Sequence, residues 1–302
     1  MKIAVLGPGG VGGLMAGALQ RARSEVVVVA RSSTVAVIAE HGIRVQSVSL
    51  GEFTARPRAV EALQEPVDTL IVATKAIGLG DALERIPSEP AIVLPLLNGL
   101  DHLALLRERF ADSTVLAGSI RVEADRPQAG VVVHTSPFLR VDMACDRPGL
   151  RAAMEELSSL LSEAGIPARV LDSEAQVMWS KLVRLNALAC TTSAYDKLLG
   201  EIRGTPRLRA DLVGAIEEGC AAGRAEGADV EPKAAIAELD GAHDTLGSSM
   251  QRDIAAGREP ELDAIPGSVL RAAARHGLQC PTIERLLALI SARIEGSAPG
   301  AQ

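Results

Sequence analysis

A glycine-rich loop close to the N-terminus has the spacing of a phosphate-binding turn. It fits the pattern G-x-G-x-x-G and reads Gly7-Pro8-Gly9-Gly10-Val11-Gly12. An apolar run at residues 2–6 precedes it and a helical pattern at residues 11–21 follows, and this context makes the pattern informative. Gly7 allows a tight turn, Gly9 lets the backbone approach a pyrophosphate, and Gly12 lets helix and strand pack closely. The helix N-terminus would hold the phosphates, unless the loop is a turn without a ligand.

The end of the second apolar run indicates which dinucleotide the loop would bind. Enzymes that use NAD place an Asp or Glu at this point to hold the ribose 2′-hydroxyl. This chain has no acid there and reads Val29-Ala30-Arg31-Ser32-Ser33. A guanidinium with neighbouring hydroxyls suits a 2′-phosphate, so the sequence predicts NADP(H) as the cofactor. The alternative is that Arg31 is a solvated surface residue.

Two more polar side chains follow later apolar runs. Lys75 comes after residues 67–73, and Asn98 comes after residues 91–94. Ligands of parallel sheets bind at the carboxyl ends of the strands, where these residues would lie. We therefore expect Lys75 to meet a phosphate or ribose of the cofactor and Asn98 to offer a donor and an acceptor.

A lysine interrupts an apolar helical pattern in the second half of the chain. Lys181 is surrounded by Met178, Trp179, Leu182 and Val183. Partial burial would lower its pKa and make it an effective proton donor near neutral pH. The alternative is a solvated lysine on the outer face of the helix. Further on, residues 248–253 and 258–263 are rich in charge and, taken alone, predict only a solvated surface.

The elements that must position these residues change character along the chain. Apolar strands alternate with helical patterns at first, which predicts a parallel sheet covered on both faces. Residues 119–123 and 130–135 alternate in polarity and predict antiparallel strands that close the edge of this sheet. Almost everything from Pro148 onward is helical. The sequence thus predicts an α/β protein, with a Rossmann-like domain at residues 1–172 that binds NADP and an all-α domain at residues 173–302. The second domain would serve substrate and catalysis if the candidate proton donor Lys181 acts there.

Composition excludes several other classes. A net charge of −7 argues against a nucleic-acid or anionic-membrane binder, and apolar runs are too short to span a membrane. The 4 cysteines stand apart, which is typical of a reduced, cytoplasmic protein. The 5 histidines have no metal-ligand spacing, so no metal is expected, and there is no nucleophile motif. The apolar faces of the C-terminal helices are compatible with a homodimer and equally with a domain core.

Taken together, the motifs resemble those of the ketopantoate reductase family (2-dehydropantoate 2-reductase). The resemblance covers nearly the whole chain, and the order and spacing of the motifs are specific although each is short. They are the glycine loop of residues 7–12, Ala73-Thr74-Lys75-Ala76, Leu97-Asn98-Gly99, Gly130-Val131-Val132-Val133-His134, Trp179-Ser180-Lys181-Leu182, Ser248-Ser249-Met250 with Asp253, and Glu261-Leu262-Asp263.

The resemblance implies that NADPH reduces a 2-oxo acid substrate to a 2-hydroxy acid. It implies that Lys181 is the general acid and that Glu261 is a carboxylate that orients the substrate or the lysine. Ser249 matches a substrate-binding serine, and Asn98 matches an asparagine between nicotinamide and substrate. Lys75 matches the lysine on the cofactor side. Negative charge develops on the carbonyl oxygen during hydride transfer, and a nearby ammonium would stabilise it.

The chain departs from the family pattern next to the lysine. Members that act in pantothenate biosynthesis resemble one another in carrying Asn four and eight residues after it, where this chain has Leu185 and Ala189. Asn186 is one position away, which on a helix is about 100° of rotation. We expect 2-dehydropantoate as substrate, with another 2-oxo acid or a ketone as the alternative. A non-catalytic NADPH-binding sensor is a third hypothesis, which the presence of Lys181 and Glu261 disfavours.

Overall fold

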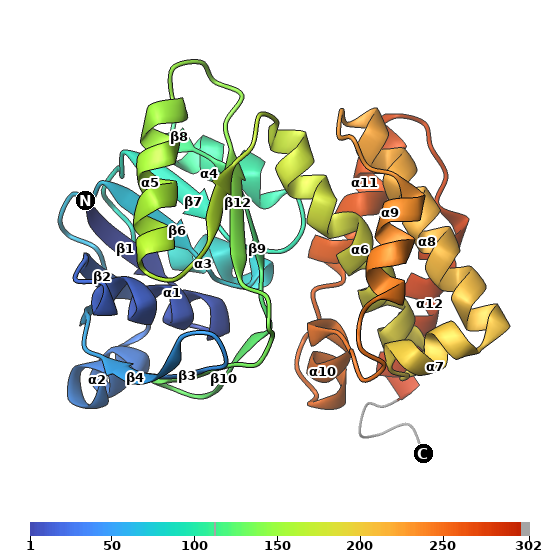
Figure 1. Cartoon of the computed structure of the whole chain (residues 1–302), viewed down its shortest axis with the longest axis horizontal. Coiled ribbons are helices and arrows are strands. Elements are labelled where there is room, and N and C mark those ends of the chain that lie inside the picture. Colours follow the sequence, from blue (N-terminus) through green and yellow to red (C-terminus); the bar gives the residue numbers. More distant parts are fainter. Residues whose placement is uncertain (112, 297–302) are drawn as a thin grey trace. The chain divides into compact units, whose positions relative to one another are not determined.

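The chain folds into two compact units. The computed structural model describes residues 1–111 and 113–296. Unit 1 is Met1–Val177, and unit 2 begins at Met178. Unit 1 contains the strands and unit 2 is helical (Figure 1). The fold is therefore the expected combination of a Rossmann-like domain and an all-α domain.

A six-stranded parallel sheet forms the centre of unit 1. Its spatial order is β5-β2-β1-β6-β7-β8. The strands are β1 (Lys2–Leu6), β2 (Glu25–Val29), β5 (Arg58–Val60), β6 (Thr69–Val72), β7 (Ile92–Pro95) and β8 (Thr114–Val115). If only these six strands are numbered along the chain, their spatial order is that of a doubly wound dinucleotide-binding domain. The direction in which successive strands are added to the sheet reverses between β1 and β6. Ligands of such sheets bind at this point of reversal.

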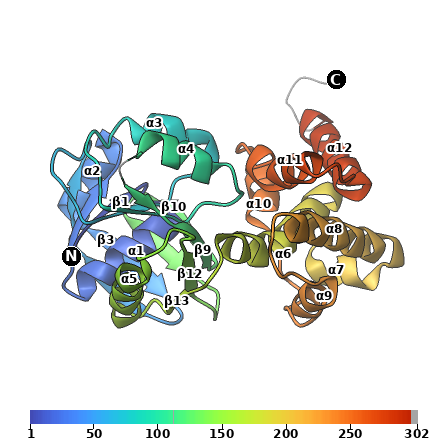
Figure 2. The same ribbon diagram turned by 90° about the horizontal axis from the view of Figure 1, so that it is seen from above.

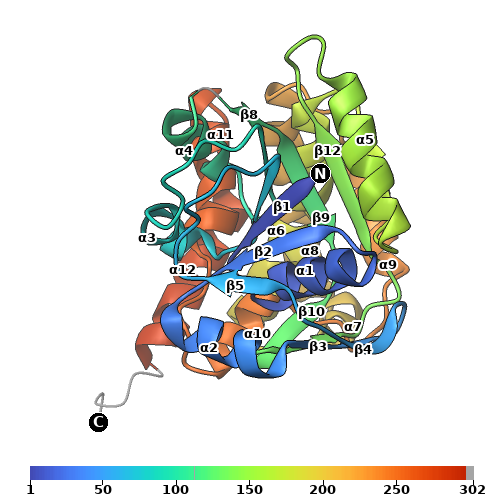
Figure 3. The same cartoon turned by 90° about the vertical axis from the view of Figure 1, so that its left-hand side faces the viewer.

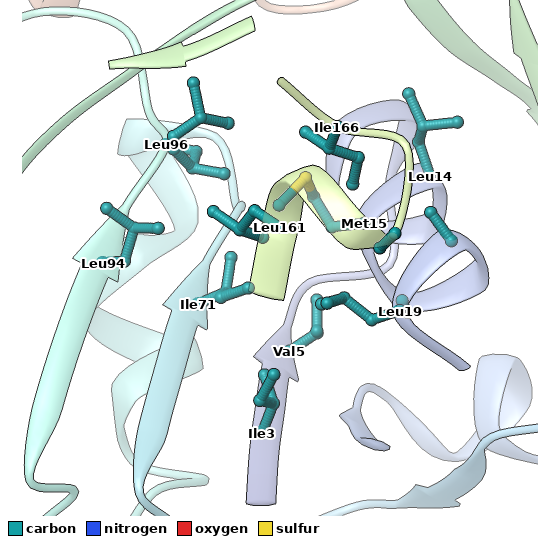
Figure 4. Close-up of a cluster of buried hydrophobic side chains, with 14 of the residues drawn as sticks. Ile3, Val5, Leu14, Met15, Leu19, Ile71, Leu94, Leu96, Leu161 and Ile166 are labelled. Carbon is teal, nitrogen blue, oxygen red and sulfur yellow. The ribbon is translucent and has the colours of Figure 1, made fainter. Parts of the chain in front are cut away.

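Each face of this sheet is covered by apolar side chains. Ile3 and Val5 of β1 enter one core with side chains of α1 and α5 (Figure 4), whereas Ala4 and Leu6 enter the core on the opposite face. This alternation is the two-residue period of a strand buried on both sides. The helices of unit 1 are α1 (Gly10–Arg21), α2 (Ser32–His41), the short 3₁₀ turn η1 (Ala76–Gly78), α3 (Leu79–Leu83), α4 (His102–Arg109) and α5 (Arg151–Glu163).

Two smaller sheets complete unit 1. One has the order β10-β11-β3-β4 and the other β13-β12-β9. Their strands are β3 (Ile43–Ser47), β4 (Gly51–Ala55), β9 (Ala117–Arg121), β10 (Ala124–Gln128), β11 (Val131–His134), β12 (Arg140–Ala144) and β13 (Ala168–Val170). Residues 119–123 and 130–135 do take part in antiparallel pairs, since β9 pairs with β12 and β11 with β10. Their expected place at the edge of the parallel sheet is wrong, because they belong to two separate sheets. Helix α1 lies between the parallel sheet and the β3 sheet (Figure 3), so β10 and β11 instead cover its outer face.

Unit 2 is built around two long helices, α6 (Glu174–Tyr195) and α8 (Pro206–Ala225). The other helices are α7 (Leu199–Gly204), α9 (Pro232–Asp240), α10 (Ser249–Ala255), the π-turn η2 (Asp263–Gly267), α11 (Ser268–Arg275) and α12 (Pro281–Gly296). Helix α8 packs against α7, α9, α11 and α12 (Figure 2). It also approaches α6 closely, since a Cβ added at Gly223 would lie 3.1 Å from ring atoms of Trp179.

The first turn of α6 belongs to unit 1. The carboxylate of Glu174 accepts a hydrogen bond from the Asp146 N–H at 3.1 Å, and the Glu174 N–H donates to the Asp146 carboxylate at 3.1 Å. Arg107 of α4 donates to the same glutamate at 2.7 Å. These bonds explain why the division falls after Val177, five residues later than the boundary expected from the sequence.

Candidate active site

The glycine loop connects the end of β1 to the start of α1 through a tight turn. Gly7 has a positive φ of 86°, which favours glycine, and its N–H donates to the Val29 carbonyl of β2 at 3.1 Å. A Cβ at Gly12 would lie 2.2 Å from the Gly7 carbonyl oxygen, so only glycine lets α1 approach the strand. Gly9 precedes α1 and caps it with no side chain, which leaves the first helix N–H groups to a ligand.

Two further observations test whether a dinucleotide fits this loop. A Cβ added at Gly9 would have nothing within 4 Å, so the loop is open at the residue that the motif assigns to the pyrophosphate. Beside Gly7, the buried Oγ1 of Thr74 has no hydrogen-bond partner among the described residues. A buried hydroxyl without a partner is costly, and a phosphate or ribose oxygen would satisfy it. The residues present therefore fit the cofactor.

The other cofactor-side residues predicted from the sequence lie at the same edge of the sheet. Arg31 follows β2, is exposed and precedes α2, whose first residues Ser32 and Ser33 are exposed too. Lys75 follows β6 and is exposed, while Asn98 follows β7 and is partly buried. Because β2, β1, β6 and β7 are neighbours and parallel, their carboxyl ends bring these side chains to one edge. Asn98 precedes Gly99, whose φ of 85° turns the chain away from the sheet.

The predicted proton donor lies in unit 2 on α6. Lys181 is partly buried, and its neighbours Trp179 and Leu182 are 1% and 3% exposed. A residue four positions along a helix lies about 40° away around the axis, so Leu185 shares the face of Lys181. Leu185 is partly buried, whereas Ala189 is fully buried. The side chain that stands beside Lys181 is thus apolar.

Asn186 points elsewhere and does not replace the missing family asparagine. It is 0% exposed and lies about 140° around the helix from Lys181. Its Oδ1 accepts a weak bond from Cys190 Sγ at 3.4 Å, and its Nδ2 has no partner among the described residues. The interior direction agrees with the rotation expected from its position in the sequence.

The predicted substrate serine begins α10. Ser249 is exposed, whereas Ser248 before it and Met250 after it are 3% and 1% exposed. Ser248 caps the helix by accepting a hydrogen bond from the Gln251 N–H at 3.0 Å. It also contacts Thr192 of α6, with 2.8 Å between the two hydroxyl oxygens. Sequence reasoning missed Thr192 and its contact with Ser248, because the two residues are 56 positions apart and no local pattern indicates the contact.

The predicted carboxylate follows α10 after a tight loop. Glu261 is partly buried and stands two residues before the π-turn η2, and its carbonyl accepts from the Ile265 N–H at 3.0 Å. The buried Asp253 holds the loop, since Arg258 donates to it from the backbone at 2.8 Å and from Nε at 2.9 Å. The charged stretch is thus an ordered connection between Ser249 and Glu261 and not merely a solvated surface.

Two other properties bear on the class of site. Within residues 1–111 and 113–296, no three His, Cys, Asp or Glu side chains are grouped so that they could hold a metal ion. Over the same residues, no helix combines the length and the apolar character needed to cross a membrane. Burial raises the pKa of the Cys190 thiol to about 12 and that of Cys220 to about 11, so these thiols are poor nucleophiles at neutral pH.

The chain matches sequence profiles over both units. The profile of "Ketopantoate reductase PanE/ApbA" matches residues 3–144, and that of "Ketopantoate reductase PanE/ApbA C terminal" matches residues 173–295. The chain is 28% identical over 302 residues to the 2-dehydropantoate 2-reductase of Caulobacter vibrioides, covering 96% of this chain and 98% of that protein. It is 28% identical over 300 residues to the "Uncharacterized oxidoreductase YkpB" of Bacillus subtilis, covering 95% and 97%.

A solved structure is similar along the whole chain. The ternary structure of D-mandelate dehydrogenase with NADH and anilino(oxo)acetate aligns with a TM-score of 0.89 and covers 98% of this chain and 99% of its own. Its identity of 23% shows a shared fold. From the two profile matches and the fold of each unit, the chain belongs to the ketopantoate reductase family of NADP-dependent oxidoreductases that reduce 2-oxo acids.

Proposed function

We propose that this protein reduces 2-dehydropantoate to pantoate with NADPH, a step of pantothenate biosynthesis, and that Lys181 is the general acid. The observation that carries the proposal is the place of Lys181 on α6, where it is partly buried and has the buried apolar side chains of Trp179 and Leu182 close to it along the helix. Apolar surroundings favour release of a proton from an ammonium group. The match to 2-dehydropantoate 2-reductases over nearly the whole chain supports the substrate.

Separate residues would bind the cofactor and transfer the proton. Residues 7–12 and Thr74 would hold the pyrophosphate and its neighbouring oxygens, and Arg31 the 2′-phosphate. When bound, the cofactor supplies the hydride that forms the new C–H bond at carbon 2 of the substrate. Lys181 gives a proton to the carbonyl oxygen, which becomes the hydroxyl of the product. The neutral amine of Lys181 then takes a proton from water before the next turnover.

The remaining site residues would orient the substrate. Ser249 offers its exposed hydroxyl to the 2-oxo acid, and the Glu261 carboxylate orients the substrate or the Lys181 ammonium. Asn98 offers an amide donor and acceptor to substrate and nicotinamide, and Lys75 binds on the cofactor side. Of these groups, the Ser249 hydroxyl and the Asn98 amide are the hydrogen-bond donors that could stabilise the negative charge developing on the carbonyl oxygen.

The test is NADPH oxidation by the purified protein with 2-dehydropantoate, with NADH in parallel. We expect turnover with NADPH, and we expect Lys181→Ala to lower kcat by about 10²-fold or more with unchanged affinity for NADPH. Lys197→Ala is the matched control, because Lys197 forms an exposed ion pair with Glu201. A Lys181→Ala protein with full activity would show that another group gives the proton. Tight NADPH binding without turnover on any 2-oxo acid would instead favour a sensor.

A second candidate function is reduction of a 2-oxo acid with an apolar side chain. The observation that favours it is Leu185, which is partly buried on the face of Lys181, where the resemblance leads us to expect an amide. A site without a partner for the substrate hydroxyl discriminates weakly in favour of a hydroxyl-bearing substrate. The structural neighbour named D-mandelate dehydrogenase shares this fold.

Leu185→Asn separates the two candidates. If the site is suited to 2-dehydropantoate, the wild-type enzyme should prefer this compound over 3-methyl-2-oxobutanoate. The Leu185→Asn variant should then change this preference little. If the site is built for apolar side chains, wild type should prefer the second compound. The variant should then shift the ratio of kcat/KM toward 2-dehydropantoate by about fivefold, the effect of one added hydrogen bond.

A further inference from the structure

The contact between Thr192 and Ser248 joins α6 to the start of α10 inside unit 2. Both side chains are buried, and the two hydroxyl oxygens are 2.8 Å apart. Thr192 Oγ1 also lies 2.7 Å from the Leu188 carbonyl oxygen, and Ser248 Oγ accepts from the Gln251 N–H at 3.0 Å. Each hydroxyl therefore contacts the other hydroxyl as well as a backbone group of its own helix or cap.

The directions of these hydrogen bonds follow from their number of protons. A carbonyl oxygen cannot donate, so the single hydroxyl proton of Thr192 points to Leu188. The proton between the two hydroxyls must then come from Ser248, which donates to Thr192 and accepts from Gln251. Every group in this chain of bonds is satisfied, and a satisfied buried network has one defined arrangement.

Thr192 lies on the same face of α6 as Lys181. The two are eleven residues apart, which is about 20° from exact alignment after three turns and about 16 Å along the axis. Ser249 follows Ser248 directly and is exposed, while Met250 on its other side is buried. Buried neighbours on both sides leave the Ser249 hydroxyl little freedom to move relative to α6.

We propose that Thr192 is a positioning residue for the reaction. Acting through Ser248, it fixes the start of α10, and with it the Ser249 hydroxyl, to the helix that carries Lys181. The inference rests on the proposed function, in which Ser249 and Lys181 contact the same 2-oxo acid. Thr192 itself contacts no substrate, because it is fully buried.

The test compares Thr192→Val with Thr191→Val. Valine keeps the shape of threonine and removes the hydroxyl. Thr191 is a matched control, since it is equally buried and, among the residues that the structure describes, its hydroxyl bonds to the Ala187 and Leu188 carbonyls of its own helix alone. We expect Thr192→Val to raise KM for the 2-oxo acid about fivefold with little change in kcat, as loss of uniform substrate binding does. Thr192→Ser should restore the KM, and Thr191→Val should keep it.

Two further measurements separate positioning from a structural role. If Thr192 acts through Ser249, Thr192→Val should add nothing to the KM of Ser249→Ala in the double variant. Amide hydrogen exchange at Gln251 should quicken in Thr192→Val, because its acceptor Ser248 is no longer held. An unchanged KM, an equal rise in Thr191→Val, additive effects or unchanged exchange would each overturn the inference. Wild type without turnover on any 2-oxo acid would overturn the proposed function as well, whereas these four results leave it intact.

Discussion

The Ser47 hydroxyl lies 2.8 Å from Nδ1 of His134, and both residues are buried where β3 and β11 pair in parallel. Ser136 Oγ donates its only proton to the Phe138 carbonyl at 2.7 Å. In its contact with His134 at 3.1 Å, Ser136 Oγ is therefore the acceptor, and the Nε2–H of the imidazole is the donor. With Nε2 protonated in the neutral ring, Nδ1 accepts from Ser47. The network thus satisfies both ring nitrogens of a neutral His134.

This arrangement predicts acid sensitivity of unit 1. Burial lowers the pKa of His134 from its ordinary value of 6.5, because it disfavours the charged ring. As pH falls below about 6.5 the unfolded chain binds this proton before the folded chain does, so the free energy of unfolding decreases. Above that pH, His134 is neutral in both the folded and the unfolded chain and does not change the free energy of unfolding. Urea unfolding measured from pH 8 to pH 5 should show the decrease, and His134→Gln should flatten it. His41→Gln, at an exposed histidine, should behave like wild type; a curve unchanged by His134→Gln would contradict the assignment.

Gly9 and Gly12 should respond differently to alanine. At Gly9 a Cβ meets nothing within 4 Å, so Gly9→Ala should fold normally and weaken NADPH binding about tenfold or more by occupying the space of the pyrophosphate. At Gly12 a Cβ would lie 2.2 Å from the Gly7 carbonyl oxygen, so Gly12→Ala should lower the free energy of unfolding by about 1–3 kcal/mol. Thermal melts without cofactor and titration with NADPH separate the two effects. The space argument fails if Gly9→Ala binds NADPH as wild type does.

Arg31 should discriminate between the two nicotinamide cofactors. It is exposed after β2, with Ser32 and Ser33 beside it, and only NADPH carries a 2′-phosphate for it to bind. We expect Arg31→Ala to raise the Kd for NADPH about tenfold or more and to leave that for NADH nearly unchanged. Fluorescence titration of both cofactors measures this, with Arg44→Ala, at an exposed arginine of β3, as control. Equal losses for both cofactors would mean that Arg31 does not recognise the phosphate.

Asn186 should be dispensable for the reaction. Its buried Nδ2 has no partner among the described residues, so Asn186→Leu removes an unsatisfied amide and keeps the branching of the side chain. We expect the free energy of unfolding to stay equal or to rise by about 1 kcal/mol, with KM for the 2-oxo acid unchanged. Denaturant unfolding and steady-state kinetics measure the two quantities. A KM that rises severalfold would place Asn186 near the substrate after all.

Much of the fold was predictable from local patterns. The glycine spacing of residues 7–12, the apolar runs and the helical second half indicate the two kinds of domain, because each pattern depends on neighbours within a few residues. Strands β3, β4 and β5 and the pairing of β11 with β3 are not predictable in this way. His134 pairs with Ser47, 87 residues earlier, and burial of α1 between two sheets selects that pairing.

The candidate site likewise combines features that the sequence specifies with features that depend on tertiary packing. The sequence by itself determined which residue types are present, namely the glycine at position 9, the arginine at position 31, the lysine at position 181 and the leucine at position 185. Only the tertiary structure decided that the Asn186 amide is buried with its Nδ2 unsatisfied among the described residues, that Thr74 has an unsatisfied hydroxyl beside Gly7, and that Thr192 contacts Ser248. The physical reason is that burial and hydrogen-bond satisfaction depend on which distant segments pack together, and a linear pattern does not specify that.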